Sequence, residues 1–338
     1  MFMKILVTGG TGFIGSHTCV ELLGSGYEVV IVDNLLNSKA SVLDRVAAVS
    51  GKRPVLVKAD VRTRETLRGI FTEHKVDAVI HFAGLKSVGE SVQKPLQYYD
   101  NNIGSTLALC QVMAEFDVFK LVFSSSATVY GVPASVPVSE DFPLKATNPY
   151  GRSKLINEEI LRDLFVSDER WHIAMLRYFN PVGAHESGMI GEDPSGVPNN
   201  LMPYLSQVAA GKLSVLSVYG NDWPTPDGTG VRDYVHVSDL ANGHKKALEK
   251  LGQAAGVFTY NLGTERGYSV LEMIAAFERA TGQPVPYRIV GRREGDIAIC
   301  YAKASLAKAE LGWVAARGLD EMCSDLWRWQ QYSDKSVQ

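Results

Sequence analysis

The sequence predicts an α/β protein in which a doubly wound parallel sheet is followed by a smaller C-terminal α/β lobe. Short apolar runs alternate with helical patterns through the first half of the 338-residue chain. A glycine-rich turn separates the first run from the first helix. Near-continuous apolar runs are typical of parallel strands that are covered by helices on both faces.

The first predicted strand, residues 4–8, ends at a turn with the sequence GGTGFIG, and the second predicted strand ends at Asp33. Gly9 and Gly12 let the backbone approach a pyrophosphate at a helix N-terminus, and Gly15 permits close packing of helix on strand. Asp33 would accept hydrogen bonds from an adenosine ribose and repel a 2′-phosphate. The order of these features predicts a Rossmann-type site for NAD rather than NADP. Alternatively, Asp33 only caps the end of its strand.

Further apolar runs at residues 55–57, 78–82 and 120–124 continue the alternation. Ligands of such sheets bind beyond the carboxyl ends of the strands. The segments expected beside the dinucleotide are therefore Asp60 and Val61, Phe82 to Lys86, and Ser124 to Ser126.

Tyr150 and Lys154 lie four residues apart in the stretch NPYGRSK. Pro149 restricts Asn148 to extended geometry, and the helical pattern that follows places Tyr150 and Lys154 on one helix face. An isolated pair of this kind is more often a surface tyrosine packed on a lysine stem. The functional interpretation is a phenol whose pKa is lowered by the adjacent ammonium, so that it can act as a base near neutrality. Convergence with a serine hydroxyl beside a nicotinamide favours this interpretation.

Composition excludes several other classes of protein. The net charge of −3 and the lack of a basic cluster argue against a nucleic-acid partner. Apolar runs stay below the roughly 18 residues that a membrane span needs, so no membrane association and a cytoplasmic location are expected. Four scattered cysteines and seven histidines lack the spacings of disulfide or metal sites.

The chain becomes irregular and rich in glycine and proline after Asn180. We therefore expect an NAD-binding domain over residues 1–180 and a substrate-binding domain over residues 181–338. Segments near residues 232–263 are expected to return to the first domain.

Three motifs together resemble the extended short-chain dehydrogenase/reductase family: TGGTGFIG at residues 8–15, SSSATVYG at 124–131 and YGRSK at 150–154. Further segments, among them HFAGLK at 81–86, LRYFNPVGA at 176–184 and RREGD at 292–296, resemble the bacterial UDP-hexose 4-epimerases of that family. The resemblance runs over nearly the whole chain.

This resemblance implies NAD-dependent interconversion of UDP-glucose and UDP-galactose by inversion at C4 through a transient 4-keto sugar. It implies that Ser126, Tyr150 and Lys154 are catalytic. The residues that it implies around NAD are Gly9, Gly12, Phe13, Ile14, Gly15, Asp33, Asn34, Asn37, Ser38, Asp60, Val61, Phe82, Ala83, Gly84, Lys86, Asn101, Tyr150, Lys154 and Phe179. For the UDP-sugar it implies Lys86, Ser126, Tyr150, Asn180, Asn200, Leu201, Ser217, Val218, Tyr219, Arg232, Arg293, Asp296 and Cys300. Relatives are commonly homodimers that pair through helices near residues 100–115 and 153–167.

Several of these residues have structural alternatives. Arg232 and Arg293 suit a diphosphate because a guanidinium binds phosphate oxygens bidentately. They could instead be solvated or paired with the adjacent Asp233 and Glu294. Asn101 could cap a helix, and Lys86 could be a surface lysine.

The chemical alternatives are a nucleotide-sugar 4,6-dehydratase, a plain dehydrogenase and a non-catalytic NAD sensor. Dehydratases of the family carry an Asp-Glu pair beside the serine or threonine, where this chain has Ala127 and Thr128. A dehydrogenase would accumulate NADH, and sensors lack the tyrosine or the lysine.

Cys300 stands where bacterial relatives that use only unacetylated sugars carry a bulky tyrosine. A thiol there would enlarge the pocket, so the sequence predicts that UDP-N-acetylglucosamine and its galactosamine epimer are also interconverted. Alternatively, Cys300 is filler and Tyr301 occupies the space of the tyrosine.

Overall fold

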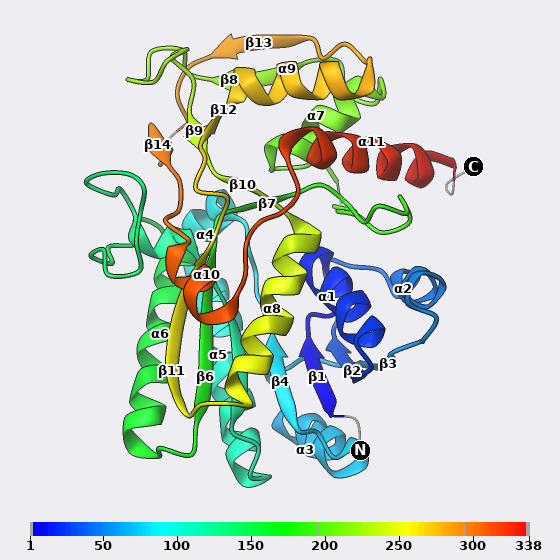
Figure 1. Ribbon diagram of the computed structural model, residues 1–338, viewed down its shortest axis with the longest axis vertical. Helices are drawn as coiled ribbons and strands as arrows, with labels where there is room; N and C mark the ends of the chain where they lie inside the picture. Colours follow the sequence, from blue (N-terminus) through cyan, green and yellow to red (C-terminus); the bar gives the residue numbers. More distant parts are fainter. Residues whose placement is uncertain (1–2, 195, 294, 336–338) are drawn as a thin grey trace.

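The computed structural model describes residues 3–194, 196–293 and 295–335. A seven-stranded parallel sheet forms its lower lobe, with the strand order β11-β6-β5-β4-β1-β2-β3 (Figure 1). The order reverses beside β1, which confirms the predicted doubly wound Rossmann-type sheet. The strands are β1 (Lys4–Thr8), β2 (Glu28–Asp33), β3 (Val55–Lys58), β4 (Ala78–His81), β5 (Lys120–Ser126), β6 (His172–Tyr178) and β11 (Gly256–Leu262).

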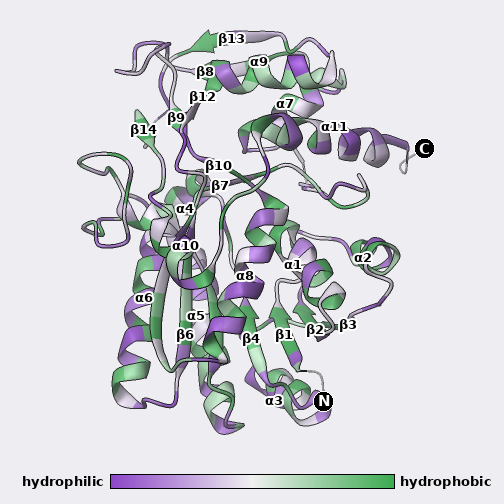
Figure 2. Cartoon of the chain, viewed as in Figure 1, coloured by the Kyte–Doolittle hydropathy of each residue, from purple (hydrophilic) through white to green (hydrophobic). Residues whose placement is uncertain are grey.

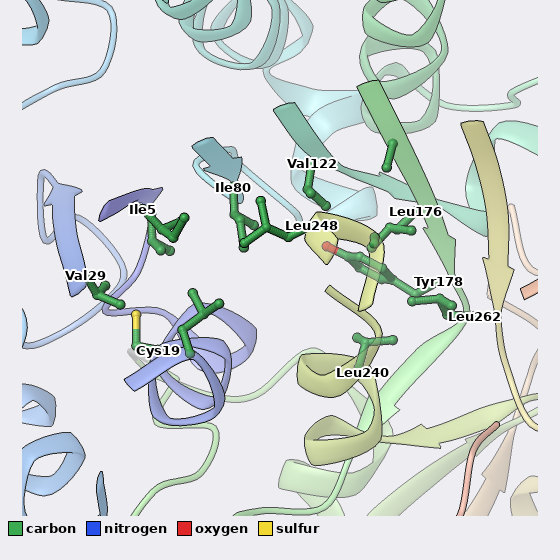
Figure 3. Packing of buried hydrophobic residues seen from close by; sticks show 14 of the residues in the cluster. Ile5, Cys19, Val29, Ile80, Val122, Leu176, Tyr178, Leu240, Leu248 and Leu262 are labelled. Atoms are coloured by element: carbon green, nitrogen blue, oxygen red, sulfur yellow. The ribbon is translucent and has the colours of Figure 1, made fainter. Parts of the chain in front are cut away.

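Both faces of this sheet are buried because alternate side chains of each strand enter different cores. In β1, Ile5 and Val7 belong to one apolar cluster and Leu6 to the other. Figure 3 shows the first cluster, in which side chains of β1, β2, β4, β5, β6 and β11 meet Cys19, Leu240 and Leu248 from helices. The continuous apolar runs of the sequence follow from this burial on both faces.

Helices cover each face of the sheet. The first cluster includes residues of α1 (Phe13–Gly24), α2 (Val42–Ser50), α8 (Val237–Leu251) and α10 (Ser305–Leu311). The opposite face carries α3 (Arg64–His74), α5 (Pro95–Glu115) and α6 (Pro149–Ser167), with α4 (Val88–Gln93) packed on α5 and α6. Figure 2 shows hydrophobic residues along the strands, whereas the helices also carry hydrophilic residues.

The upper lobe lies above the carboxyl edge of the sheet (Figure 1). It contains α7 (Leu201–Ala209), α9 (Val270–Thr281) and α11 (Leu319–Lys335), whose apolar faces share one core with Leu216 and Val218. Its small sheets are the pair β7 (Asn180–Val182) with β10 (Tyr234–His236), the pair β8 (Leu216–Tyr219) with β13 (Tyr287–Val290), and β12 (Tyr268–Ser269), β9 (Val231–Arg232) and β14 (Ile299–Cys300) together.

The chain passes between the two lobes more than once. After β10, α8 packs on α1, and β11 pairs with β6 as the edge strand of the large sheet. Ala307 and Leu311 of α10, with Trp313, enter the same core, although the expected boundary placed them in the second domain. Within the described residues, no helix is both long and apolar enough to cross a membrane.

Candidate active site

The glycine-rich turn between β1 and α1 lines a cavity at the carboxyl edge of the large sheet. Gly9 has a φ of 70°, and a Cβ there would lie 2.8 Å from the Ala83 nitrogen. A Cβ on Gly15 would lie 2.4 Å from the Gly9 oxygen, so both positions require glycine. Gly12 precedes α1 without a capping side chain. The helix N-terminus therefore fits a pyrophosphate, which its backbone N–H groups can bind.

Asp33 lies at the end of β2 and is 8% exposed. Its carboxylate accepts hydrogen bonds from the backbone nitrogens of Thr11, at 3.2 Å, and Leu35, at 2.9 Å, and from the Ser38 hydroxyl at 3.3 Å. Asp33 thus organises the end of its strand, as the structural alternative expected, and also lines the cavity. A carboxylate in this place suits a ribose and disfavours a 2′-phosphate.

The sheet-edge cavity, as we name it, has a volume of about 330 Å³. Every residue expected around NAD lines it, including Asn34, Asp60, Phe82 and Asn101. Sequence reasoning missed Ala59, Ser105 and Tyr178, which also line it. Tyr178 is the last residue of β6, a strand whose sequence suggests only that it is buried. No local signal therefore marked Tyr178 as a residue of the site.

The start of α6 positions Tyr150 and Lys154. Asn148 caps the helix by accepting a hydrogen bond from the Gly151 nitrogen at 2.9 Å, and Pro149 begins the helix. The Lys154 Nζ lies 6.0 Å from the centroid of the Tyr150 ring. It donates a hydrogen bond to the Ser124 carbonyl at 2.7 Å, which fixes the ammonium on β5.

Ser126 lies at the end of β5 and lines the same cavity as Tyr150 and Lys154. Its Oγ accepts hydrogen bonds from the Thr128 nitrogen at 3.2 Å and from the Thr128 Oγ1 at 3.0 Å. Thr128 therefore orients the serine. From the sequence, Thr128 was considered only because it stands where dehydratases carry an acidic residue. The structure brings the three predicted catalytic side chains to one place.

The phenol is not as acidic as the sequence analysis expected. Burial raises the pKa of Tyr150, and the hydrogen bond with Ser126 lowers it only in part. Burial also lowers the pKa of Lys154 to about 8, which the Glu158 carboxylate partly opposes. The ammonium is bound to a backbone carbonyl rather than to the phenol, so an acidic tyrosine needs a further positive charge beside it.

A buried ion pair lies close to these residues and was missed from the sequence. The Arg177 guanidinium donates to both oxygens of Glu158, at 2.9 and 2.6 Å, and the two side chains are 1% and 0% exposed. Ser125 also donates to Glu158. Arg177 donates to the Tyr130 hydroxyl at 3.0 Å, so the pair joins α6, β5, β6 and the helical turn η1 (Ala127–Tyr130).

A second cavity, which we name the upper-lobe cavity, has a volume of about 290 Å³. Asn180, Pro181 and Asn200 line both cavities, so the two adjoin one another. The predicted residues that line the upper-lobe cavity are Asn180, Asn200, Leu201, Ser217, Val218, Tyr219, Arg232, Arg293 and Asp296. Lys86, Ser126 and Tyr150 line the sheet-edge cavity instead. Among the residues that sequence reasoning missed are Met202, Tyr204 and Trp223.

Arg293 pairs with Asp296 at 2.9 Å, and its guanidinium carbon lies 5.4 Å from the centroid of the Tyr219 ring. Arg232 donates to the Val231 carbonyl at 2.9 Å. The hydrogen-bond partners of both cations are thus within three residues of them in the chain, and Arg293 also lies over the ring of Tyr219.

The sequence offered Asp233 and Glu294 as alternative partners of these two arginines. Asp233 is buried and accepts hydrogen bonds from Thr264 and from the Ala302 nitrogen rather than from Arg232. Glu294 lies outside the described residues.

Two further expectations need correction. Asn101 is not a helix cap, because α5 begins at Pro95 and Asn101 lies in its second turn, where it lines the sheet-edge cavity. Cys300 does not line either cavity. The strand β14 pairs with β9, and its thiol is buried in a cluster with Val129, Tyr130 and Phe179.

Tyr301, the alternative occupant of that space, packs near Gly267, where a Cβ would lie 3.1 Å from its ring. Of the Cys300 cluster, Phe179 lines the sheet-edge cavity. The thiol therefore belongs to the packing behind the wall of that cavity.

A phenol and an ammonium one helical turn apart, facing the glycine turn of a doubly wound sheet, are the arrangement of the extended short-chain dehydrogenases/reductases. The fold and the site place the chain in that class.

Comparison with known proteins gives the family within the class. The family model described as GDP-mannose 4,6 dehydratase matches residues 6–326. The UDP-glucose 4-epimerase of Bacillus subtilis (strain 168) is 63% identical over 328 residues, which cover 97% of each chain. The chain belongs to the UDP-glucose 4-epimerase family.

Solved structures agree with this assignment. The UDP-glucose-4-epimerase from Stenotrophomonas maltophila, with bound NAD and formylated UDP-arabinopyranose, has a TM-score of 0.97 and 55% identity, and 99% of each chain is covered. The enzyme from Bifidobacterium longum, in complex with NAD+ and UDP, has a TM-score of 0.96 and 55% identity, with 98% of this chain and 99% of that chain covered.

Proposed function

We propose that the protein interconverts UDP-glucose and UDP-galactose, with NAD in the sheet-edge cavity and the uridine diphosphate in the upper-lobe cavity. One observation carries the proposal. Ser126, Tyr150 and Lys154 line a cavity that shares Asn180 and Asn200 with an adjoining cavity lined by two arginines, in a chain 63% identical to a UDP-glucose 4-epimerase. The lower lobe, including the returning segments, would serve as the NAD-binding domain.

The residues that would hold NAD fit its parts. The glycine turn and the N-terminus of α1 suit the pyrophosphate, Asp33 suits the adenosine ribose, and Phe82 to Lys86 suit the rest of the dinucleotide. When bound, NAD supplies a hydride acceptor and a positively charged ring.

Tyr150 takes the proton of the sugar 4-hydroxyl as the base, while Ser126 hydrogen-bonds the same oxygen and relays the proton. The C4 hydrogen would pass with the bonding electron pair to the ring of NAD held in the sheet-edge cavity, and a 4-keto sugar would form. Return of the hydride to the other face of C4 and of the proton to O4 inverts the configuration without net oxidation. Lys154 contributes positive charge, which favours the phenolate form of Tyr150.

The upper-lobe cavity suits a uridine diphosphate. Arg232 and Arg293 can bind phosphate oxygens bidentately, and Asn180 and Asn200 offer directional amides. Tyr219 offers a ring on which uracil can stack. A sugar held mainly through its diphosphate is free to turn over between the two hydride transfers.

The activity is tested by incubating the protein with UDP-galactose and following product identity together with NADH absorbance. We expect UDP-glucose without accumulation of NADH. Release of a dehydrated keto sugar would indicate a 4,6-dehydratase, and steady accumulation of NADH would indicate a dehydrogenase. In this structure Ala127 and Thr128 occupy the turn after Ser126, and neither side chain is an acid that could assist the elimination of water.

We further propose that UDP-N-acetylglucosamine and its galactosamine epimer are substrates. Cys300 is a small side chain packed in one cluster with Phe179, which lines the sheet-edge cavity, so the size of the side chain at position 300 bears on where that wall lies. Cys300→Tyr should suppress the acetylated activity selectively. Equal loss with acetylated and unacetylated sugars would reject this extension.

We also propose a cytoplasmic homodimer. The cysteines Cys19, Cys110, Cys300 and Cys323 are buried and unpaired, which suits a reducing compartment. Leu107 on α5 and Val166 on α6 are exposed hydrophobic residues on the two helices expected to pair. Light scattering should give a mass of twice the 36.9 kDa chain.

A further inference from the structure

Glu192 lies on the segment between β7 and α7, where the upper lobe approaches the sheet-edge cavity. Its main chain is held in place by α11. The Trp329 indole donates a hydrogen bond to the Glu192 carbonyl at 3.0 Å. A Cβ on Gly191 would lie 2.3 Å from the Trp329 ring, so the chain lies flat against a tryptophan that is 3% exposed.

The Glu192 carboxylate reaches two residues of the candidate site. Its Oε1 accepts hydrogen bonds from the Lys86 Nζ at 2.8 Å and from the Asn200 Nδ2 at 3.1 Å. Lys86 lines the sheet-edge cavity, and Asn200 lines both cavities. The Glu192 side chain is only 8% exposed, so its charge depends on these two donors for compensation.

The chemistry of a carboxylate fixes the orientation of the Asn200 amide. An ionised carboxylate only accepts hydrogen bonds, so the amide nitrogen must face Glu192 and the amide oxygen is left to accept from a ligand. The same oxygen atom holds the Lys86 ammonium at the rim of the sheet-edge cavity. The Glu192 carboxylate thus holds both Lys86, which lines the cavity for the dinucleotide, and Asn200, which lines both cavities.

We propose that Glu192 is a positioning residue that couples the two cavities, orienting Asn200 for the UDP-sugar and Lys86 for NAD. The proposal rests on the function proposed above. Among the described residues that line either cavity Glu192 is not found, so it acts through Lys86 and Asn200 rather than by touching a ligand.

The test compares Glu192→Ala and Glu192→Gln with the wild-type protein. The readouts are KM and kcat for UDP-galactose, the NAD that stays bound through gel filtration, and the melting temperature. Glu192→Ala removes both contacts, so we expect KM to rise about tenfold and bound NAD to fall, with kcat changed less than KM. Glutamine keeps an acceptor for Asn200 but loses the charge that faces Lys86. It should restore KM to within about twofold of wild type while bound NAD stays low.

The matched control is Asp193→Asn, next in the chain. Asp193 pairs with Lys39 at 2.9 Å, and that pair contacts neither Asn200 nor Lys86. Its KM and NAD content should stay within about twofold of wild type.

Two results would overturn the proposal. One is a Glu192→Ala protein with the KM and bound NAD of the wild type. The other is a lower melting temperature and kcat with unchanged KM and NAD content, since that pattern indicates a purely structural role. NAD content is measured without turnover, so it tests the Lys86 contact even if wild-type protein fails to epimerise UDP-galactose, which would refute the proposed function separately.

Discussion

The two cavities differ in how their polar side chains are held. In the sheet-edge cavity, Lys154 and Asp33 are 5% and 8% exposed, and both are hydrogen-bonded to backbone groups at the ends of β1, β2 and β5. In the upper-lobe cavity, the Arg293 side chain is 55% exposed and Tyr219 is 44% exposed. Arg293 has a partner only three residues away, Asp296.

We propose that this difference separates the residues that act in the reaction from those that recognise the substrate. Side chains fixed by a buried sheet hold reacting groups in a constant geometry, which proton and hydride transfer require. Exposed cations with local partners can exchange those partners for phosphate oxygens when a ligand arrives. We therefore expect substitutions in the sheet-edge cavity to affect turnover and stability. Substitutions in the upper-lobe cavity should affect binding.

The largest effect should come from Tyr150→Phe. Removing the hydroxyl would eliminate the proposed base but leave the ring buried in the same place, so kcat should fall roughly 10²–10⁴-fold. Binding of UDP-galactose, measured by calorimetry, should change little because the expected phosphate ligands lie in the other cavity. Near-normal turnover would remove Tyr150 from the mechanism.

Glu158→Gln should have the next largest effect, on stability. The substitution leaves the Arg177 guanidinium buried without its carboxylate, which costs about 3–5 kcal/mol of unfolding free energy. Urea denaturation measures the loss.

The matched substitution in the upper lobe is Asp296→Asn, which breaks the exposed pair with Arg293 and should cost less than about 1 kcal/mol. If Asp296→Asn were as destabilising as Glu158→Gln, there would be no contrast between rigid side chains near the sheet-edge cavity and adaptable side chains at the upper-lobe cavity.

Local pattern was enough to predict the first five strands of the lower lobe, because β1 to β5 and their connecting turns are contiguous in sequence. The glycine turn, Asp33 and the stretch NPYGRSK each combine strand, turn or helix signals within a few residues. The full set of residues around NAD was implied by the family resemblance, and all of them line one cavity.

Features that depend on distant pairing were not predictable in this way. Arg177 and Glu158 have the sequence appearance of ordinary charged residues, and only the packing of α6 on β5 and β6 buries them together. The place of Cys300 likewise depends on the pairing of β14 with β9, which no local pattern indicates. The contact of Glu192 with Lys86 joins residues 106 positions apart.

The pH dependence of turnover should report on Lys154. Burial lowers the pKa of this lysine to about 8 in the folded protein, below its ordinary value of 10.5. The burial penalty on stability is therefore fully present below pH 8 and is relieved as the pH rises towards 10.5. Activity should show the opposite trend, because the ammonium beside Tyr150 is lost, and kcat should fall about tenfold per pH unit above pH 8. A wild-type kcat that stays constant to pH 9.5 would contradict this role, and a Lys154→Met protein should lack the alkaline fall.

The smallest effect that we predict concerns Arg293, which lines the upper-lobe cavity. Arg293→Met should raise KM for UDP-galactose roughly tenfold with little change in kcat, because a lost phosphate contact weakens ground state and transition state alike. The neighbouring Arg292 is a matched control, since it is paired with Asp222 at 2.8 Å and stacked over Trp223 at 3.9 Å. Arg292→Met should leave KM within about twofold of wild type. If Arg293→Met instead lowered kcat and left KM unchanged, the exposed arginine would act on the reaction itself, and recognition could not be assigned to the upper cavity alone.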